Sequence, residues 1–164
     1  MEARTAQAQA QREVLVFVLG GEEYAVDILK VQEIRGYDKV TPIPKAPAFL
    51  KGIVNLRGTI VPVIDLRVKF GLEDPKYDTT TVMIVLRIGV RVIGVVVDGV
   101  SDTLGIAAGE VKAAPSMGGL VDTSYLAGLV ARDGRMILLL DIERFLSGAE
   151  LNLLAAAAAE TPAA

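Results

Sequence analysis

Residues 52–70 of this 164-residue chain read GIVNLRGTIVPVIDLRVKF. Two short apolar runs rich in β-branched residues flank a polar tip, and this pattern predicts a β-hairpin. Gly58 lies in the tip, where a positive φ lets the chain reverse tightly. The hairpin would present Arg57 at its tip, and Asp65 would cap the short helical segment that follows.

A second copy of this pattern lies at residues 128–146, which read GLVARDGRMILLLDIERFL. When the two stretches are aligned, four positions hold the same residue type: Gly52 and Gly128, Val54 and Val130, Gly58 and Gly134, and Asp65 and Asp141. A weaker echo relates residues 16–34 to residues 83–103. Two copies of one β-rich unit are the simplest explanation of both matches.

The remaining segments predict further hairpins between two irregular ends. Residues 1–12 are rich in alanine, glutamine and arginine and should form a flexible arm, and residues 155–164 should form a frayed tail. Between them we expect one domain of two β-barrel subdomains, at about 13–78 and 79–154, with strands or helices exchanged at their ends. Gly94 interrupts an apolar run and indicates either close backbone approach or a bend, as at a barrel corner.

Two segments predict other local structure. Ile28, Val31 and Ile34 recur at three-residue spacing, which is typical of a short helix with one apolar face. That face either belongs to the core or stays open and binds another helix. Residues 105–124 are rich in glycine, alanine and proline, so we expect them to be irregular.

The composition excludes several classes of function. The sequence contains no histidine, cysteine or tryptophan, so the commonest general base, the commonest metal ligand and the thiol nucleophile are missing. Most enzymes could not be built from the remaining residue types, although some glycosidases and Lys- or Asp-based enzymes could, and we expect no metal or cofactor. The net charge of −3 gives no reason to expect nucleic acid as a partner. No apolar run approaches the roughly 20 residues that cross a bilayer, and the N-terminus lacks a secretory signal, so we expect a cytoplasmic protein without direct membrane insertion.

Carboxylates are the main remaining source of chemistry. Asp65 and Asp141 occupy equivalent positions after a strand, where helix capping accounts for both better than catalysis does. Asp98 and Asp102 flank Gly99 and are typical turn residues. The alternative is a small-molecule-binding or carboxylate-dependent hydrolytic β-barrel that uses this pair. Nothing in the spacing of the carboxylates supports hydrolysis.

Arg57 has two interpretations. Its repeat counterpart is Asp133, so the fold does not require a cation at this turn. Arg57 is either a solvated tip residue or an anchor that pairs with a carboxylate on a partner, for which a guanidinium is well suited. Glu33, beside Val31 and Ile34, offers the mix of charge and apolar surface that is typical of a modest protein–protein contact.

Three longer runs carry a family resemblance: LVFVLGGEEYAVDILKVQEIRGYDKVT, PAFLKGIVNLRGTIVPVIDLRVKF and VIGVVVDGVSDTL. They resemble the CheW family of bacterial chemotaxis coupling proteins, over about residues 14–154. The resemblance implies a mainly β fold of two intertwined five-stranded SH3-like β-barrel subdomains with a few short helices. It also implies a scaffold without catalysis, which joins the cytoplasmic tips of chemoreceptors to the regulatory domain of the histidine kinase CheA in receptor arrays at the inner face of the membrane.

Carried over by position, the resemblance assigns residues to two interfaces. The receptor-binding set is Ile28, Val31, Glu33, Ile34, Arg57, Val82, Gly94 and Val100. The kinase-binding set is Val40, Thr41 and Gly52. The same domain also occurs in CheA and CheV, but this chain has no room for a kinase or receiver domain, so we expect a stand-alone adaptor.

Overall fold

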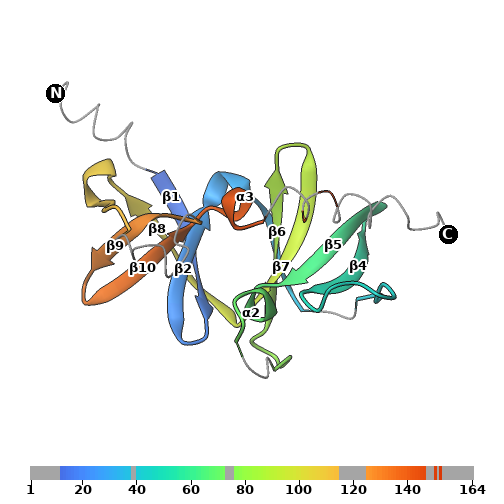
Figure 1. Cartoon of the computed structure of the whole chain (residues 1–164). Helices are drawn as coiled ribbons and strands as arrows, with labels where there is room; N and C mark the ends of the chain where they lie inside the picture. The colour runs from blue at the N-terminus through green and yellow to red at the C-terminus, as the bar shows by residue number, and fades with distance from the viewer. Residues whose placement is uncertain are drawn as a thin grey trace.

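The computed structural model describes residues 12–37, 40–72, 76–114, 125–146, 150 and 152, and they form two five-stranded β-sheets side by side (Figure 1). Sheet A has the strand order β8-β1-β2-β10-β9, and sheet B has the order β3-β6-β7-β5-β4. The strands are β1 (Arg12–Leu19), β2 (Glu22–Asp27), β3 (Val31–Gly36), β4 (Leu50–Leu56), β5 (Thr59–Asp65), β6 (Val82–Ile88), β7 (Arg91–Val97), β8 (Gly99–Ile106), β9 (Leu126–Arg132) and β10 (Arg135–Leu140). The short helices are η1 (Ile28–Lys30), α2 (Leu66–Lys69), η2 (Ala108–Glu110) and α3 (Ile142–Phe145).

The two sheets confirm the mainly β fold of two five-stranded units, and they are compatible with SH3-like barrels. Each sheet takes in two strands that the sequence repeat assigns to the other unit, β1 and β2 in sheet A and β6 and β7 in sheet B. Sheet B consists of the consecutive strands β3 to β7, whereas sheet A consists of β1, β2 and β8 to β10. The expected division into 13–78 and 79–154 therefore separates the two sequence repeats. Each sheet, however, contains strands from both of these ranges.

The expected arm at 1–12 and tail at 155–164 concern the two ends of the chain. Residues 1–11 and 153–164 lie outside the described residues, whereas Arg12 is already the first residue of β1. In the part of the chain that the structure describes, no helix is both long enough and apolar enough to cross a membrane.

The predicted hairpin at residues 52–70 is confirmed, and so is its repeat. Strands β4 and β5 pair antiparallel, and the turn between them places Arg57 at φ 52° and Gly58 at φ 89°. The N–H of Gly58 donates to Asn55 Oδ1 at 2.8 Å, which closes the turn. Asp133 and Gly134 repeat these angles, at 52° and 76°, between β9 and β10. Two successive positive φ values are typical of the tightest hairpin turns.

The predicted helix caps are also confirmed. The Asp65 carboxylate accepts a hydrogen bond from the N–H of Arg67 at 2.9 Å and begins α2. The Asp141 carboxylate accepts one from the N–H of Arg144 at 3.3 Å and begins α3. Capping satisfies donors at the helix start that have no partner within the helix.

The predicted helix over residues 28–34 is wrong beyond Lys30. Only Ile28–Lys30 is helical, and β3 begins at Val31 and pairs antiparallel with β6. Side chains alternate along a strand, so Val31 packs against the core while Ile34 is 45% exposed. The three-residue spacing therefore does not form a single apolar face, and the β-branched residues follow their preference for a strand.

The sequence predicts an irregular chain from residue 105, and it does not predict β8. This strand reaches Ile106 and pairs antiparallel with β1 along most of its length. It contains Gly, Ser, Asp and Thr residues with few apolar ones, so its pairing with β1 decides its structure more than its own β propensity does. Residues 115–124 of the predicted irregular segment lie outside the described residues.

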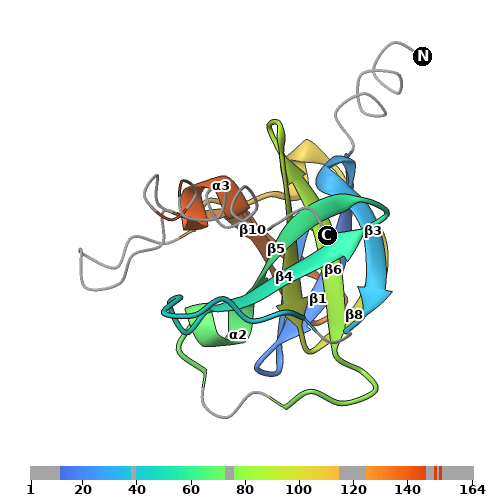
Figure 2. The same cartoon turned by 90° about the vertical axis from the view of Figure 1, so that its right-hand side faces the viewer.

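A continuous apolar core fills the space between the sheets, and in the turned view sheet B lies in front of sheet A (Figure 2). Leu15 of β1 and Ile84 of β6 contribute to this inter-sheet core. Their neighbours point the other way, Val16 into a cluster within sheet A and Val85 into a cluster within sheet B. Both faces of β1 and β6 are thus buried, which explains their nearly continuous apolar sequences.

Candidate partner-binding site

An ion pair links the tip of the β4–β5 hairpin to β3, which is an edge strand of sheet B. Arg57 donates from Nη2 to Glu33 Oε1 at 3.2 Å and from Nη1 to Oε2 at 3.4 Å. Arg35 lies 3.7 Å from the same carboxylate. The Arg57 side chain remains 68% exposed, and an exposed pair contributes at most about 1 kcal/mol to stability. The pair therefore matters more for orienting the guanidinium than for holding the fold together.

A hollow of about 160 Å³ lies beside this pair. It takes residues from β3, β4, the hairpin tip, β5 and β7: Gln32, Leu56, Arg57, Thr59, Val61 and Val92. Its volume is well below the roughly 300–1,000 Å³ of a typical small-molecule site. The mixture of a cation, polar side chains and aliphatic side chains is typical of a protein–protein contact.

Four residues of the predicted receptor-binding set lie along the inter-sheet core. Ile28, Val31, Val82 and Val100 are each partly buried and pack against that core. They belong to η1, β3, β6 and β8, so elements of both sheets contribute. The four residues therefore contact one core from both sheets, although Val31 and Val82 lie near opposite ends of the β3–β6 pair.

Two residues of the same set lie apart from this group. Ile34 is on the outward face of β3. Gly94 is buried in β7, and a Cβ atom there would lie 2.7 Å from Met83 Sδ. The atoms that crowd Gly94 are therefore side-chain atoms of Met83 and Val63 and not another backbone, and its part in receptor binding stays a prediction.

The predicted kinase-binding residues gather at one side of β4. Thr41 and Ile53 exchange two backbone hydrogen bonds of 2.9 Å. Gly52 precedes Ile53 with φ 146°, and a side chain there would overlap the backbone of Thr41. Val40 packs against the apolar cluster within sheet B. These contacts show a structural role for Gly52, and kinase binding by all three residues stays a prediction.

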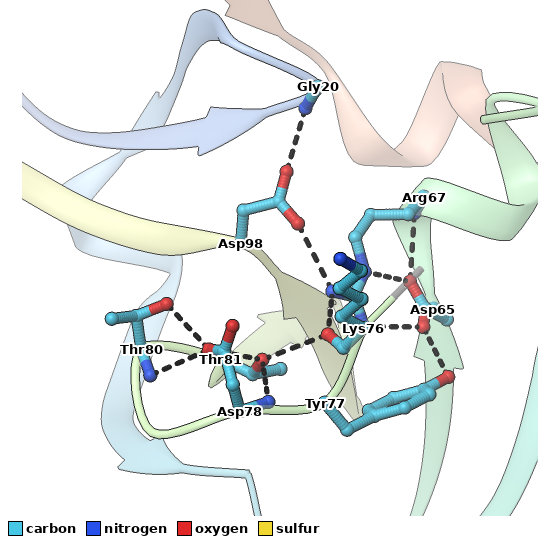
Figure 3. Close-up of polar contacts among 9 residues, drawn as sticks. All are labelled: Gly20, Asp65, Arg67, Lys76, Tyr77, Asp78, Thr80, Thr81 and Asp98. Carbon is cyan, nitrogen blue, oxygen red and sulfur yellow. Dashed lines mark hydrogen bonds and ion pairs between the residues drawn. The ribbon is translucent and has the colours of Figure 1, made fainter. Parts of the chain in front are cut away.

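A buried polar network centres on Arg67, whose side chain is 3% exposed (Figure 3). Its Nε and Nη2 donate to the two carboxylate oxygens of Asp65, each at 3.0 Å. Its Nη1 donates to the carbonyl of Lys76 at 2.6 Å and to Asp98 Oδ1 at 3.1 Å. The other oxygen of Asp98 accepts the N–H of Gly20 at 2.8 Å. The network therefore connects the β1–β2 turn of sheet A to α2, the helix that directly follows β5 of sheet B.

The electrostatics of this network favour fixed protonation states. Burial alone would lower the pKa of Arg67, but the hydrogen bonds and charges of Asp65 and Asp98 outweigh it and hold that pKa above its usual value. The Tyr77 hydroxyl donates to Asp65 Oδ2 at 2.6 Å. Burial raises the pKa of Tyr77, and the neighbouring Asp65 carboxylate raises it further. A permanent cation and a neutral phenol suit structural support more than acid–base catalysis, which needs pKa values near the working pH.

The carboxylates of the alternative hypothesis do not converge. Asp98 contacts Gly20 and Arg67, whereas Asp102 pairs with Arg135 of β10 at 3.2 Å. Among the described residues, no group of three or more acidic, histidine or cysteine side chains is arranged to hold a metal ion. A second cavity, between sheet A and β6, has a volume of about 100 Å³ and mainly aliphatic walls. None of these features resembles a polar ligand site.

Sequence reasoning missed the network around Arg67, although one signal was available. Arg67 follows Asp65 by two positions, directly after a strand that the sequence predicts to be buried. A cation so close to the core needs a buried partner, and Asp65 is the nearest carboxylate. The equivalent position in the second repeat holds Glu143, which is exposed. The network therefore belongs to only one of the two repeats.

Comparison with known proteins assigns the chain to a family. Residues 13–150 match the family model of the CheW-like domain. The chain is 56% identical to the chemotaxis protein CheW of Klebsiella aerogenes over 142 residues, which cover 87% of this chain and 86% of the relative. It is 36% identical to that of Rhizobium meliloti, over 80% of this chain and 85% of the relative. The crystal structure of the scaffolding protein TtCheW from Thermoanaerobacter tengcongensis matches with a TM-score of 0.72 and 32% identity, over 79% of this chain and 88% of that one. This chain therefore belongs to the CheW-like family of chemotaxis coupling proteins, which are scaffolds and not enzymes.

Proposed function

We propose that this chain is an adaptor that couples the cytoplasmic tips of chemoreceptors to the regulatory domain of the histidine kinase CheA. In this proposal it works at the cytoplasmic face of the membrane, within receptor arrays. The family match covers the strands of both sheets. The single observation that carries the proposal is the exposed Arg57 guanidinium, which Glu33 of β3 orients beside the hollow lined by Leu56, Val61 and Val92.

The receptor-binding surface in this proposal combines an apolar strip with a charged end. Ile28, Val31 and Val100 supply partly buried aliphatic groups at the junction of the sheets. Arg57 supplies guanidinium donors that suit a carboxylate of the partner. A helix that presents an apolar stripe with an acidic residue at one end would fit such a surface, in the helix-in-groove mode of recognition.

The kinase-binding surface in this proposal is the side of β4 near Thr41 and Gly52. Thr41 is exposed, and its backbone is held by the bridge to Ile53. The two proposed surfaces use different parts of sheet B, so both partners can bind at once. Single contacts of this size tend to be weak, and repeated contacts in an array would strengthen them through multivalency.

Equilibrium binding of the purified chain to a receptor-tip fragment and to the regulatory domain of CheA, separately and together, tests the proposal. We expect binding to each partner and formation of a ternary complex. Arg57→Ala should weaken receptor-tip binding about tenfold, because interface arginines are often energetic hot spots. The same variant should leave kinase binding unchanged.

Arg144→Ala is the matched control, because the Arg144 side chain is 66% exposed and also pairs with a carboxylate, that of Asp141. It lies on α3, outside both proposed surfaces, and should bind both partners as the unmodified chain does. If Arg57→Ala and Arg144→Ala bind the receptor tip equally well, the proposed receptor surface is wrong. If the unmodified chain binds neither partner, the proposed function itself is wrong.

A further inference from the structure

Within the described residues, the chain crosses from one sheet to the other at two places. The first crossing leads from β2 in sheet A to β3 in sheet B through the three residues of η1. The second leads from β7 in sheet B to β8 in sheet A, and Asp98 is the only residue between these strands. Asp98 is therefore the shorter of the two links between the sheets.

Asp98 is fixed from both sheets. Its N–H donates to the carbonyl of Val18 in β1 at 3.0 Å. One carboxylate oxygen accepts the N–H of Gly20 in the β1–β2 turn, and the other accepts a hydrogen bond from Arg67 next to β5 (Figure 3). Leu72, which follows α2, packs at the Gly20 backbone, within 3.0 Å of where a Cβ atom would lie. The crossing is thus pinned by one main-chain and two side-chain hydrogen bonds.

Arg67, which donates a hydrogen bond to Asp98, is itself held in a fixed position. Four hydrogen bonds hold its guanidinium in place: two to Asp65, one to the Lys76 carbonyl and one to Asp98. The face of the Tyr77 ring lies 4.8 Å from its Cζ atom. A guanidinium bound on several sides loses its rotamer freedom and transmits the position of one element to the next.

Two apolar residues at the junction of the sheets lie close in sequence to the two crossings. Val100 comes two positions after Asp98, and Val31 is the first residue after η1. They belong to different sheets, and both pack against the inter-sheet core. A change in the angle between the sheets would therefore change the spacing of Val31 and Val100.

We propose that Asp98 and Arg67 form a joint that fixes the orientation of sheet A relative to sheet B and so sets the spacing of the apolar residues to which a receptor helix docks. Asp98 and Arg67 are positioning residues in this proposal and do not touch the receptor. The docking part of the inference rests on the proposed function. The orientation part does not, because it concerns the chain alone.

The orientation can be measured directly, because the natural sequence has no cysteine. Val90→Cys, in the β6–β7 turn of sheet B, and Met136→Cys, on β10 of sheet A, give two unique labelling positions. The residues that they replace are 95% and 53% exposed, so spin labels should not disturb the core. Pulsed electron paramagnetic resonance then reports the distribution of distances between the labels, and hence between the sheets.

Asp98→Ala in this labelled chain removes the attachments to Gly20 and Arg67. Arg67 keeps both bonds to Asp65, and the Asp98 side chain is 37% exposed, so the variant should fold. Asp98→Asn, which keeps one acceptor oxygen, is the milder second variant. Glu110→Ala is the matched control, because it removes an ion pair with Arg132 that lies beside sheet A alone.

We expect Asp98→Ala to broaden the distance distribution about twofold and to weaken receptor-tip binding about fivefold, with kinase binding unchanged. Asp98→Asn should show smaller changes of the same kind, and Glu110→Ala should match the unmodified chain in both measurements. If thermal melting shows that Asp98→Ala is folded and its distribution of distances between the labels is unchanged, the proposed joint does not exist. A broader distribution with unchanged receptor-tip affinity would overturn its part in docking. If the unmodified chain binds no receptor tip, the proposed function fails, and the distance measurement still decides whether the joint exists.

Discussion

Gly52 and Gly128 occupy equivalent places in the two repeats, and each lets an extra extended segment approach its strand. Thr41 and Lys112 form isolated bridges with the residues that follow the two glycines. A Cβ atom on Gly52 would overlap the backbone of Thr41, and one on Gly128 would lie 2.5 Å from Val111 Cγ1 and 3.0 Å from the Lys112 carbonyl. The repeated glycine is therefore explained by packing that occurs twice in the fold.

Gly52→Ala should be the more damaging of the two substitutions. Its obstacle is backbone, and its φ of 146° is one that other residues rarely adopt, so we expect a loss of about 3 kcal/mol in the free energy of unfolding. Gly128→Ala should lose about 1–2 kcal/mol, because its closest obstacle is a side chain that can move. Urea denaturation measures both. Gly36→Ala, where nothing lies within 4 Å of the new Cβ, is the control and should stay within about 1 kcal/mol.

Asp65→Ala should destabilise the protein strongly. The substitution leaves the buried Arg67 guanidinium with Asp98 as its only carboxylate among the described residues. Removing one partner of a buried ion pair typically costs about 3–5 kcal/mol. Asp102→Ala breaks an exposed pair with Arg135 and should cost less than about 1 kcal/mol. Equal losses in urea denaturation would show that the Arg67 network contributes no more than a surface pair.

The stability of the protein should fall at high pH in a way that depends on Tyr77. Burial and the Asp65 carboxylate raise the pKa of Tyr77 in the folded state. The neutral phenol is thus favoured by folding, and this contribution is complete below the unfolded pKa of about 10 and is lost as the pH rises through the folded pKa.

Tyr77→Phe isolates this effect. At pH 7 the variant should be less stable by about 1–2 kcal/mol, because the buried Asp65 loses a hydrogen bond. Above about pH 10 the gap between the two proteins should narrow, since only the unmodified chain has this group to ionise. Urea denaturation at pH 7, 9 and 10.5 gives the comparison. A gap that widens with pH would contradict the assignment.

Local chemistry explains why some elements could be predicted from the sequence. The β4–β5 turn depends on Gly58, and the helix starts depend on Asp65 and Asp141, so short windows were sufficient. The inter-sheet core was predictable only in outline, because an apolar run indicates that a segment is buried but not which strand it packs against. The interpretation of residues 28–34 failed because periods of two and of three both fit so few residues.

Other features depend on contacts between distant parts of the chain. β8 is a strand because β1 lies beside it, and no short window contains that fact. The pair of Arg57 and Glu33 joins a hairpin tip to an edge strand, so the sequence suggested both residues without indicating that they touch. The meeting of Gly20, Arg67 and Asp98 likewise follows from the crossing of the chain between the sheets.

The alternation along β3 separates two neighbouring residues of the predicted receptor-binding set. Val31 packs against the inter-sheet core, whereas Ile34 is 45% exposed. Val31→Glu places a charge against aliphatic side chains and should cost about 2–4 kcal/mol. Ile34→Glu places it in solvent and should change stability by less than about 1 kcal/mol.

Ile34→Glu is consequently the cleaner test of receptor binding on β3. We expect it to weaken receptor-tip binding about tenfold with an unchanged urea midpoint, because a charge would replace an aliphatic contact in the interface. Met136→Glu is the control, because Met136 is also an exposed apolar residue but lies in sheet A, away from β3. This variant should bind normally. If Ile34→Glu binds the receptor tip as well as the unmodified chain, the outward face of β3 is not part of the interface. Receptor contact on this strand would then be confined to the side that carries Val31, because a strand has only these two faces.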